Sequence, residues 1–443
     1  MDLRRHVALA LADTFLAGDA NQVSLVAGAR HALGRDWRWI AHVCRALLRR
    51  TGEHFHAFSR DELAEFILTR DIFQDAWQGP RPHPEVRHYC IDPPRPVAPP
   101  GWVASLSLPH LPTQGDLARW LGASATELDW FADRWRRDGI TDERLRHYHY
   151  RWVTKKSGGM RLIEIPKERL RSVQRQVLRQ VLSRLPLHDA AHGFRRWHSA
   201  LTHAALHGGQ AIVIRMDLQD FFASIPASRV QALFAEIGYS NGVAGVLARL
   251  CTNRVSRDLL HAADRHAANR LRNRHLPQGA PSSPSLANLC AFRLDMRLAA
   301  LAASIGARYS RYADDLTFSG DAGLARAFRR FHIQVAAIAL EEGFVVNTRK
   351  TRFMSAGTRQ MVTGIVVNQG MNVVRKDFDR LKATLTNCIR HGTTSQNREG
   401  HADFRAHLAG RIAHMQGINA GRGKKLSALF ERIDWHVAQT GAA

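Results

Sequence analysis

Two adjacent aspartates, Asp314 and Asp315, are well suited to bind a divalent cation. They lie in the stretch Tyr312-Ala-Asp-Asp315, with apolar and aromatic residues on both sides. Neighbouring carboxylates repel each other, and a cation such as Mg²⁺, which prefers hard oxygen ligands, would remove that repulsion. A solvated Asp-Asp turn explains the pair equally well when the pair is considered alone.

A third aspartate, Asp217, favours the metal site. It ends the short, mostly apolar run Ala211–Met216, which predicts a buried strand. The alternation around Asp314 and Asp315 predicts a β-hairpin whose tight turn holds both aspartates. A strand that ends beside this hairpin would bring three carboxylates to one point. Two-metal phosphoryl transfer needs such a cluster, because one ion activates the attacking hydroxyl and the other stabilises the leaving pyrophosphate.

These segments resemble the palm of reverse transcriptases. The resemblance rests on three motifs in chain order: Asp217 with Phe222 five residues on, Leu276-Pro-Gln-Gly-Ala-Pro-Ser-Ser-Pro284, and Tyr312-Ala-Asp-Asp315. It covers residues 105–435 and implies an α+β (mixed) fold, the right-hand polymerase, with fingers, a palm of antiparallel sheet plus helices, and a helical thumb. It also implies an enzyme that copies RNA into DNA with Mg²⁺. The expected catalytic residues are the three aspartates, and the expected metal ligands are Asp217, Leu218, Asp314 and Asp315.

Two predicted strands, at 148–153 and 160–165, resemble the fingers hairpin of the family. Lys155 or Lys156 and Arg161 would close on the triphosphate of the incoming nucleotide there. An exposed basic hairpin is the alternative that the residues alone leave open.

Three further matches concern the nucleotide. Phe222 stands where a bulky ring in the family blocks a ribose 2′-hydroxyl. Gln278 matches the glutamine that lines the nucleotide pocket. Lys350 matches a position near the triphosphate, where it could protonate or neutralise the leaving pyrophosphate. Because Lys350 has arginines close by in the sequence, a plain basic surface is almost as good an explanation of it.

Two features resemble the retron subgroup of reverse transcriptases. Val362-Thr363-Gly364 matches the retron-type VTG in the primer-grip region. The segment from His203 to His207 resembles the retron pattern Asn-Ala-x-x-His, with His203 in the place of the asparagine. The resemblance predicts that both histidines contact RNA.

The segment His192–Ser199 resembles the next fingers motif of the family. Arg195 or Arg196 would there contact template or nucleotide phosphate. The charge of the chain agrees with such a partner, because the formal net charge is +24. Residues 1–100 contribute only +1, so the excess of +23 coincides with the polymerase-like part.

The five cysteines are scattered and form no CxxC pair, so they indicate reduced thiols and neither a disulfide framework nor a zinc site. The sequence shows no signal peptide and no apolar run as long as a membrane span. We therefore expect a cytoplasmic enzyme without a membrane partner.

The expected domains follow in chain order. Residues 1–91 form an N-terminal helical accessory domain, and 92–101 form a Pro-rich linker. Residues 102–147 form a helical pair that leads into the fingers. Fingers and palm occupy 148–370, and the helical thumb occupies 371–443.

The resemblance implies that the protein is a retron enzyme, which uses deoxynucleotides to copy a structured noncoding RNA. It would start from a 2′-hydroxyl of that RNA, pass through an RNA–DNA hybrid and leave branched, RNA-linked single-stranded DNA (msDNA). The family is associated with antiphage defence, in which an effector protein could be a partner. The alternatives are a non-retron bacterial reverse transcriptase, of a defence or domesticated group II intron type, and a catalytically silent RNA-binding scaffold. The intact Asp217, Asp314 and Asp315 argue against the scaffold.

Overall fold

The structure is a computed structural model that describes residues 2–18, 20–52, 55, 58, 60–79, 82–90, 101–133, 142–155 and 158–435. Most of the Pro-rich segment 92–101, and Lys156 of the fingers hairpin, lie outside these residues. The chain divides into two compact units. The first comprises Met1–Val103, His110–Ala125 and Ala235–Ala244, and the second comprises Ala104–Pro109, Thr126–Phe234 and Gly245–Ala443.

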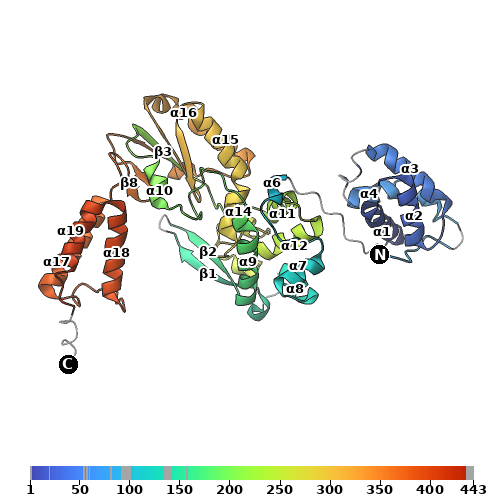
Figure 1. Ribbon diagram of the computed structural model, residues 1–443, viewed down its shortest axis with the longest axis horizontal. Helices are drawn as coiled ribbons and strands as arrows, with labels where there is room; N and C mark the ends of the chain where they lie inside the picture. Colours follow the sequence, from blue (N-terminus) through green and yellow to red (C-terminus); the bar gives the residue numbers. More distant parts are fainter. Residues whose placement is uncertain are drawn as a thin grey trace. The chain divides into compact units, whose positions relative to one another are not determined.

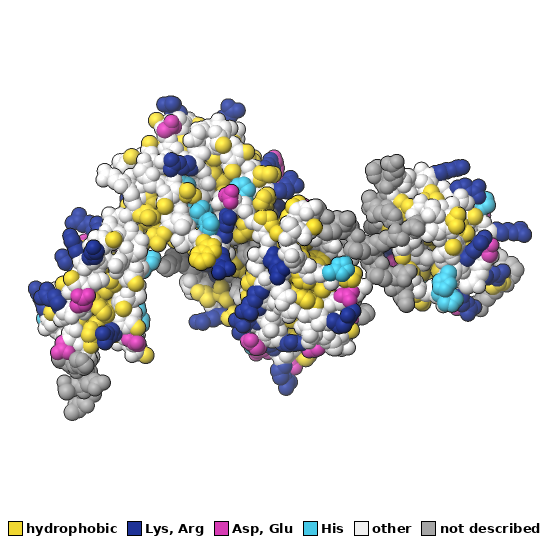
Figure 2. Space-filling model, in the orientation of Figure 1, with side chains coloured by type: hydrophobic (Ala, Val, Ile, Leu, Met, Phe, Trp, Pro, Cys, Tyr) yellow, Lys and Arg dark blue, Asp and Glu magenta, His cyan; other side chains and the backbone are white. Residues whose placement is uncertain are grey.

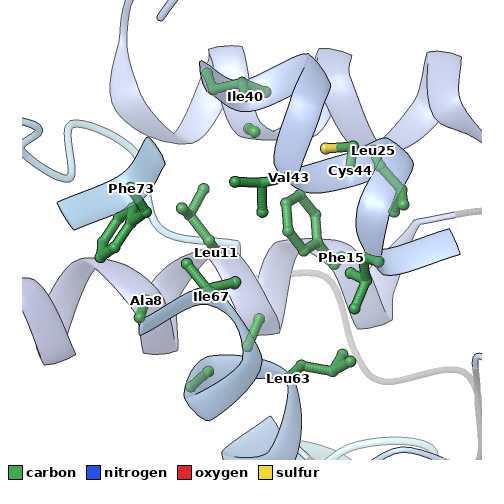
Figure 3. Packing of buried hydrophobic residues seen from close by; sticks show 14 of the residues in the cluster. Ala8, Leu11, Phe15, Leu25, Ile40, Val43, Cys44, Leu63, Ile67 and Phe73 are labelled. Carbon is green, nitrogen blue, oxygen red and sulfur yellow. The ribbon is translucent and has the colours of Figure 1, made fainter. Parts of the chain in front are cut away.

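The N-terminal part of the first unit is a bundle of short helices around its own core (Figure 1). The helices are α1 (Leu3–Ala17), α2 (Gln22–Leu33), α3 (Arg38–Thr51), α4 (Arg60–Leu68) and α5 (Asp71–Asp75). Leu11 and Phe15 of α1 meet Val43 of α3 and Leu63 of α4 in this core (Figure 3). Their helical spacing puts them on one face of each helix, so the burial follows from the sequence pattern. Helices α6 (Gly101–Ala104) and α7 (Gln114–Leu121) follow.

An antiparallel sheet of four strands, which we call the central sheet, lies in the second unit. Its order is β4 (Arg308–Tyr312), β5 (Asp315–Gly320), β3 (Ile212–Asp217) and β6 (Arg352–Ser355). The apolar strand β3 is paired on both edges, as its near-continuous burial requires. Helices α14 (Ser283–Cys290) and α15 (Phe292–Ala303) lie between β3 and β4 in the chain, and α16 (Ala322–Glu341) lies between β5 and β6. Both α15 and α16 pack on the sheet strands.

A second antiparallel pair, β1 (Tyr148–Thr154) and β2 (Met160–Pro166), forms the expected fingers hairpin. The helices around it in the chain are α8 (Ala125–Ala132), α9 (Glu168–Gln180), α11 (Ala227–Glu236), α12 (Asn241–Cys251) and α13 (Arg265–Leu271). Glu164 of β2 is buried, and it accepts hydrogen bonds from Asn253 (2.7 Å) and is paired with His275 (2.9 Å). This buried polar network fixes β2 against the segment that precedes Leu276.

The C-terminal part of the second unit is helical. The short strands β7 (Met361–Val362) and β8 (Ile365–Val366) lead to α17 (Arg375–His391), α18 (Phe404–Ile418) and α19 (Ala420–Phe430) (Figure 1). Their apolar faces share a core with residues of α10 (Ala200–Ala205) and β3. The mixed α+β fold predicted from the sequence is confirmed. Within the described residues, no helix is both long and apolar enough to cross a membrane.

Candidate active site

The predicted hairpin is formed by β4 and β5. Tyr312 pairs with Asp315, which leaves a two-residue turn of Ala313 and Asp314. Ala313 has a φ of +57°, and Asp314 is not among the residues with positive φ. This combination is that of a type II′ turn, which matches the twist of the flanking strands. Asp314 therefore lies in the turn itself, whereas Asp315 is the first residue of β5.

The central sheet brings the three aspartates together. Asp217 at the end of β3 stands directly opposite Asp315 in the register of β3 and β5. The backbone N–H of Leu218 donates to the carbonyl oxygen of Asp314 at 2.8 Å. The N–H of Asn347 donates to the carbonyl oxygen of Asp217 at 2.7 Å. Backbone hydrogen bonds thus fix all three positions.

Burial raises the proton affinity of two of these carboxylates, those of Asp314 and Asp315. Burial, followed by the charges of Asp217 and Asp315, raises the pKa of Asp314 to about 6. Burial also raises the pKa of Asp315, although the Arg215 guanidinium opposes this effect. Such a cluster of partly buried carboxylate oxygens matches the hard ligands that divalent cations prefer, so the residues fit a metal site.

Two basic side chains neutralise the cluster in this structure. Arg215 of β3 donates to Asp315, with its Nη2 at 2.9 Å from Oδ1 and 2.8 Å from Oδ2. Lys350 donates from Nζ to both oxygens of Asp217, at 3.1 and 3.0 Å. With the side chains in these positions, no group of three or more His, Cys, Asp or Glu side chains among the described residues is arranged to hold a metal ion. Arg215 was not identified from the sequence, yet it lies two residues before Asp217 and so on the same face of the strand.

The residues predicted for the nucleotide lie on four segments: the fingers hairpin, the segment after β3, the segment before α14 and the segment before β6. Lys155 reaches Asp220, three residues beyond Asp217, with 3.7 Å between Nζ and Oδ1. Arg161 is exposed on β2. The Phe222 ring is half-buried, and its centroid is 5.7 Å from that of Phe221.

Gln278 is tied to the fingers hairpin through the backbone. Its carbonyl oxygen accepts from the N–H of Glu164 at 2.9 Å. The next residue, Gly279, has a φ of +134°, and a Cβ built on it would lie 2.6 Å from the carbonyl oxygen of Glu164. Only glycine therefore permits this approach, which explains the glycine in Leu276-Pro-Gln-Gly.

The prediction that His203 and His207 contact RNA is wrong for this structure, because both side chains are 0% exposed. The His207 ring lies 2.7 Å from the hydroxyl of Ser310 on β4 and 2.7 Å from that of Ser319 on β5. The His203 ring lies 5.7 Å from that of Tyr312. Their spacing of four residues places both on the face by which this segment packs on the sheet. Burial lowers the pKa of each to about 3, so both are neutral.

The two predicted template arginines differ in their surroundings. Arg195 donates to the carbonyl oxygen of His188 at 3.1 Å and lies 3.5 Å from Asp189. Arg195 therefore stabilises the loop in which it lies. Arg196 is exposed and lies over the ring of Trp197, with 5.0 Å from Cζ to the ring centroid.

Val362-Thr363-Gly364 forms the turn between β7 and β8. Val362 pairs with Ile365 and is buried. Both turn residues have positive φ, +47° at Thr363 and +84° at Gly364, as in a type I′ turn. The Thr363 hydroxyl donates to the carbonyl oxygen of Ala200 at 3.2 Å, which joins the turn to α10.

A buried ion pair below the turn was also not identified from the sequence. Arg311 and Asp295 are both 0% exposed and are joined by two hydrogen bonds, of 2.8 and 2.6 Å. The third guanidinium nitrogen, Nη1, donates to Oδ1 of Asn288 at 3.0 Å and to the carbonyl oxygen of Ala313 at 3.1 Å. Arg311 therefore holds the backbone of the turn that carries Asp314.

Comparison with known proteins agrees with this geometry. The family model described as reverse transcriptase (RNA-dependent DNA polymerase) matches residues 153–385. Retron Mx65 reverse transcriptase of Myxococcus xanthus is 40% identical over 326 residues, 73% of each chain. Retron Mx162 reverse transcriptase of the same organism is 40% identical over 275 residues, 59% of this chain and 54% of the relative. Retron Ec86 reverse transcriptase of Escherichia coli is 32% identical over 243 residues, 54% of this chain and 69% of the relative.

Proposed function

Because this chain belongs to the retron-type reverse transcriptases and is an RNA-directed DNA polymerase, we propose that Asp217, Asp314 and Asp315 carry its chemistry with Mg²⁺. The family depends on divalent metal ions. The single observation that carries the proposal is the register that sets Asp217 opposite Asp315, beside the Asp314 turn. Carboxylate oxygens suit Mg²⁺, and Leu218 could add only its backbone carbonyl, because its side chain has no ligand atom.

The bound metal would supply stabilisation of the negative charge that develops on the transferred phosphoryl group. The chain's own residues do the rest. Lys350, beside Asp217, neutralises charge on the departing pyrophosphate, and Arg215 orients Asp315. Lys155 and Arg161 bind the triphosphate of the incoming deoxynucleotide.

Two residues select and hold the nucleotide. The Phe222 ring excludes a ribose 2′-hydroxyl, and Gln278 lines the pocket, positioned by its backbone bond to β2. The Val362-Thr363-Gly364 turn holds the primer strand.

The substrate that we propose is a structured noncoding RNA. The enzyme starts from a 2′-hydroxyl of that RNA, extends through an RNA–DNA hybrid and leaves branched, RNA-linked single-stranded DNA. The C-terminal helices 371–435 would serve as the thumb that grips the duplex by its phosphates. The exposed Lys and Arg residues of 371–435 are Arg375, Lys376, Arg380, Lys382, Arg390, Arg398, Arg405, Lys424, Lys425 and Arg432. Lys and Arg side chains are also spread over the face drawn in Figure 2.

The N-terminal residues 1–91 would be an accessory domain that couples the complex to an effector protein in antiphage defence. They have their own hydrophobic core, as such a separate domain needs (Figure 3). The remaining division would be a linker at 92–101, a helical pair at 102–147 and fingers with palm at 148–370.

Primer extension tests the catalytic assignment. Asp314→Asn should abolish extension of oligo(dT) on poly(rA) and leave RNA affinity nearly unchanged, because basic side chains that contact phosphates dominate binding. Asp379→Asn, at an exposed residue of α17, is the matched control. Appreciable primer extension by both Asp314→Asn and Asp315→Asn would contradict the assignment of these aspartates as catalytic residues.

Expression with the native flanking DNA tests the retron product. The protein should purify with single-stranded DNA covalently joined to RNA. That species should shorten on RNase treatment and disappear on debranching or in Asp314→Asn. Robust polymerase activity without any RNA-linked DNA would contradict the 2′-hydroxyl priming.

A further inference from the structure

Trp197 is a tryptophan that the fold does not bury. It is 84% exposed, the highest fraction among the large hydrophobic side chains of the described residues. Tryptophan is usually well buried in folded proteins. Its neighbours in the chain, Arg196 and His198, are polar, and Phe194 of the same loop is 49% exposed.

The backbone of this loop is held in a defined conformation. Phe194 and Trp197 have φ values of +59° and +64°, in the left-handed region that bulky residues rarely adopt. The carbonyl oxygen of Gly193 accepts from Asn288 at 2.8 Å, and the N–H of His198 donates to the carbonyl oxygen of Arg195 at 3.2 Å. The exposure of Trp197 is therefore built into the loop and does not come from fraying.

The loop begins at the catalytic turn. The N–H of His192 donates to the carbonyl oxygen of Arg311 at 2.8 Å, and a Cβ built on Gly193 would lie 2.6 Å from the backbone nitrogen of Ala313. The Phe194 ring centroid is 6.0 Å from that of Phe222. Four residues span at most about 14 Å, so Trp197 lies close to this turn.

We propose that Trp197 stacks on an unpaired template base next to the base being copied, while Arg196 contacts the adjoining phosphate. The inference rests on the proposed function and adds a template subsite to it. Bases of single-stranded nucleic acid stack on exposed aromatic rings, and a neighbouring arginine adds charge and cation–π attraction. Arg196 covers one face of the indole and leaves the other for a base.

A template base is a better stacking partner for Trp197 than the base of the incoming nucleotide. The base of that nucleotide pairs with the template, and its sugar and triphosphate have proposed partners in Phe222, Gln278 and Lys155. An unpaired template base has no pairing partner, so an aromatic ring is what can hold it in place.

The test measures binding of primed RNA templates that lack one base. In the wild type, removing the base at one unpaired position should lower affinity about 5- to 150-fold, the effect of one stacked base. Trp197→Ala should cause the same loss on the intact template and no further loss at that position. Trp197→Phe should keep most of the affinity. Trp102→Ala, which removes a half-exposed tryptophan from the other unit, should behave as the wild type.

A fluorescent base gives an independent readout. A 2-aminopurine at the same template position should be quenched by the wild type and by Trp197→Phe, but not by Trp197→Ala. Equal losses on base removal in the wild type and Trp197→Ala would overturn the inference. A higher KM for the deoxynucleotide, with no dependence on the template base, would also overturn it. If the wild type does not extend the intact primed template at all, the proposed function fails. If the wild type extends it normally but loses no affinity when any unpaired template base is removed, only the inference about Trp197 fails.

Discussion

The carboxylate cluster should destabilise the metal-free fold, and Asp314→Asn should show by how much. Burial beside Asp217 and Asp315 raises the pKa of Asp314 from 3.8 to about 6. Asparagine keeps the size of the side chain but never ionises. The variant therefore removes the cost of holding a third charge in this cluster.

The size of the effect follows from that pKa. A change from 3.8 to about 6 corresponds to about 3 kcal/mol. Because the cluster is partly exposed, screening by water reduces the expected effect to about 1–2 kcal/mol. The raised pKa fixes the sign. Between pH 3.8 and 6 the folded protein keeps a proton that the unfolded chain has lost, so stability falls as pH rises through this window.

Urea unfolding in the presence of EDTA measures the prediction. Above pH 6, Asp314→Asn should unfold at higher urea than the wild type, and this difference should disappear towards pH 4. Comparing the two proteins cancels the titration of groups outside the carboxylate cluster. Asp379→Asn should differ from the wild type by less than about 0.5 kcal/mol at both pH values. A difference that does not change with pH, or a less stable Asp314→Asn at pH 8, would refute the reasoning.

Three further predictions concern the surroundings of the site. Phe222→Val should raise ribonucleotide incorporation relative to deoxyribonucleotide in primer extension; a change within about twofold, well under 1 kcal/mol, would leave Phe222 as a core aromatic only. Asp295→Asn should cost about 3–5 kcal/mol in urea unfolding, because it leaves the buried Arg311 guanidinium unpaired. The double variant Asp295→Leu with Arg311→Met should recover stability but not polymerisation, and recovery of both would contradict a positioning role. Gly193→Ala should lower kcat with little change in RNA affinity, since its Cβ would press on the catalytic turn, whereas Gly357→Ala, which meets nothing within 4 Å, should be neutral.

The parts of the site that sequence analysis identified depend on local patterns. The alternation around Asp314 and Asp315 specifies a hairpin, and the apolar run before Asp217 specifies a buried strand. Each pattern spans only a few residues, so each is visible without knowledge of the fold. That Asp217 meets Asp315 was a hypothesis from the chemistry of a two-metal site, supported by the resemblance to a known palm, because residues about a hundred positions apart leave no local signal of contact.

The residues that were missed or misassigned depend on tertiary contacts. Arg311 has the polarity of a surface residue, and its burial depends on Asp295 from another element. His207 has a spacing that fits either a solvent-facing or a buried helix face. Ser310 and Ser319, on neighbouring strands, form hydrogen bonds with the two ring nitrogens of His207. These bonds allow the ring to be buried, so His207 lies on the buried face.

The position of β3 in the central sheet has a consequence for synthesis of the protein. Its two neighbours, β5 and β6, are made later, at Asp315–Gly320 and Arg352–Ser355. At about 5–20 residues per second, the ribosome needs about 5–20 s to pass from Asp217 to the first partner strand. During this interval an apolar strand with two unpaired edges is present on the nascent chain, where it can pair with other chains. Slower initiation or chaperone supply during expression should therefore improve the yield of folded enzyme.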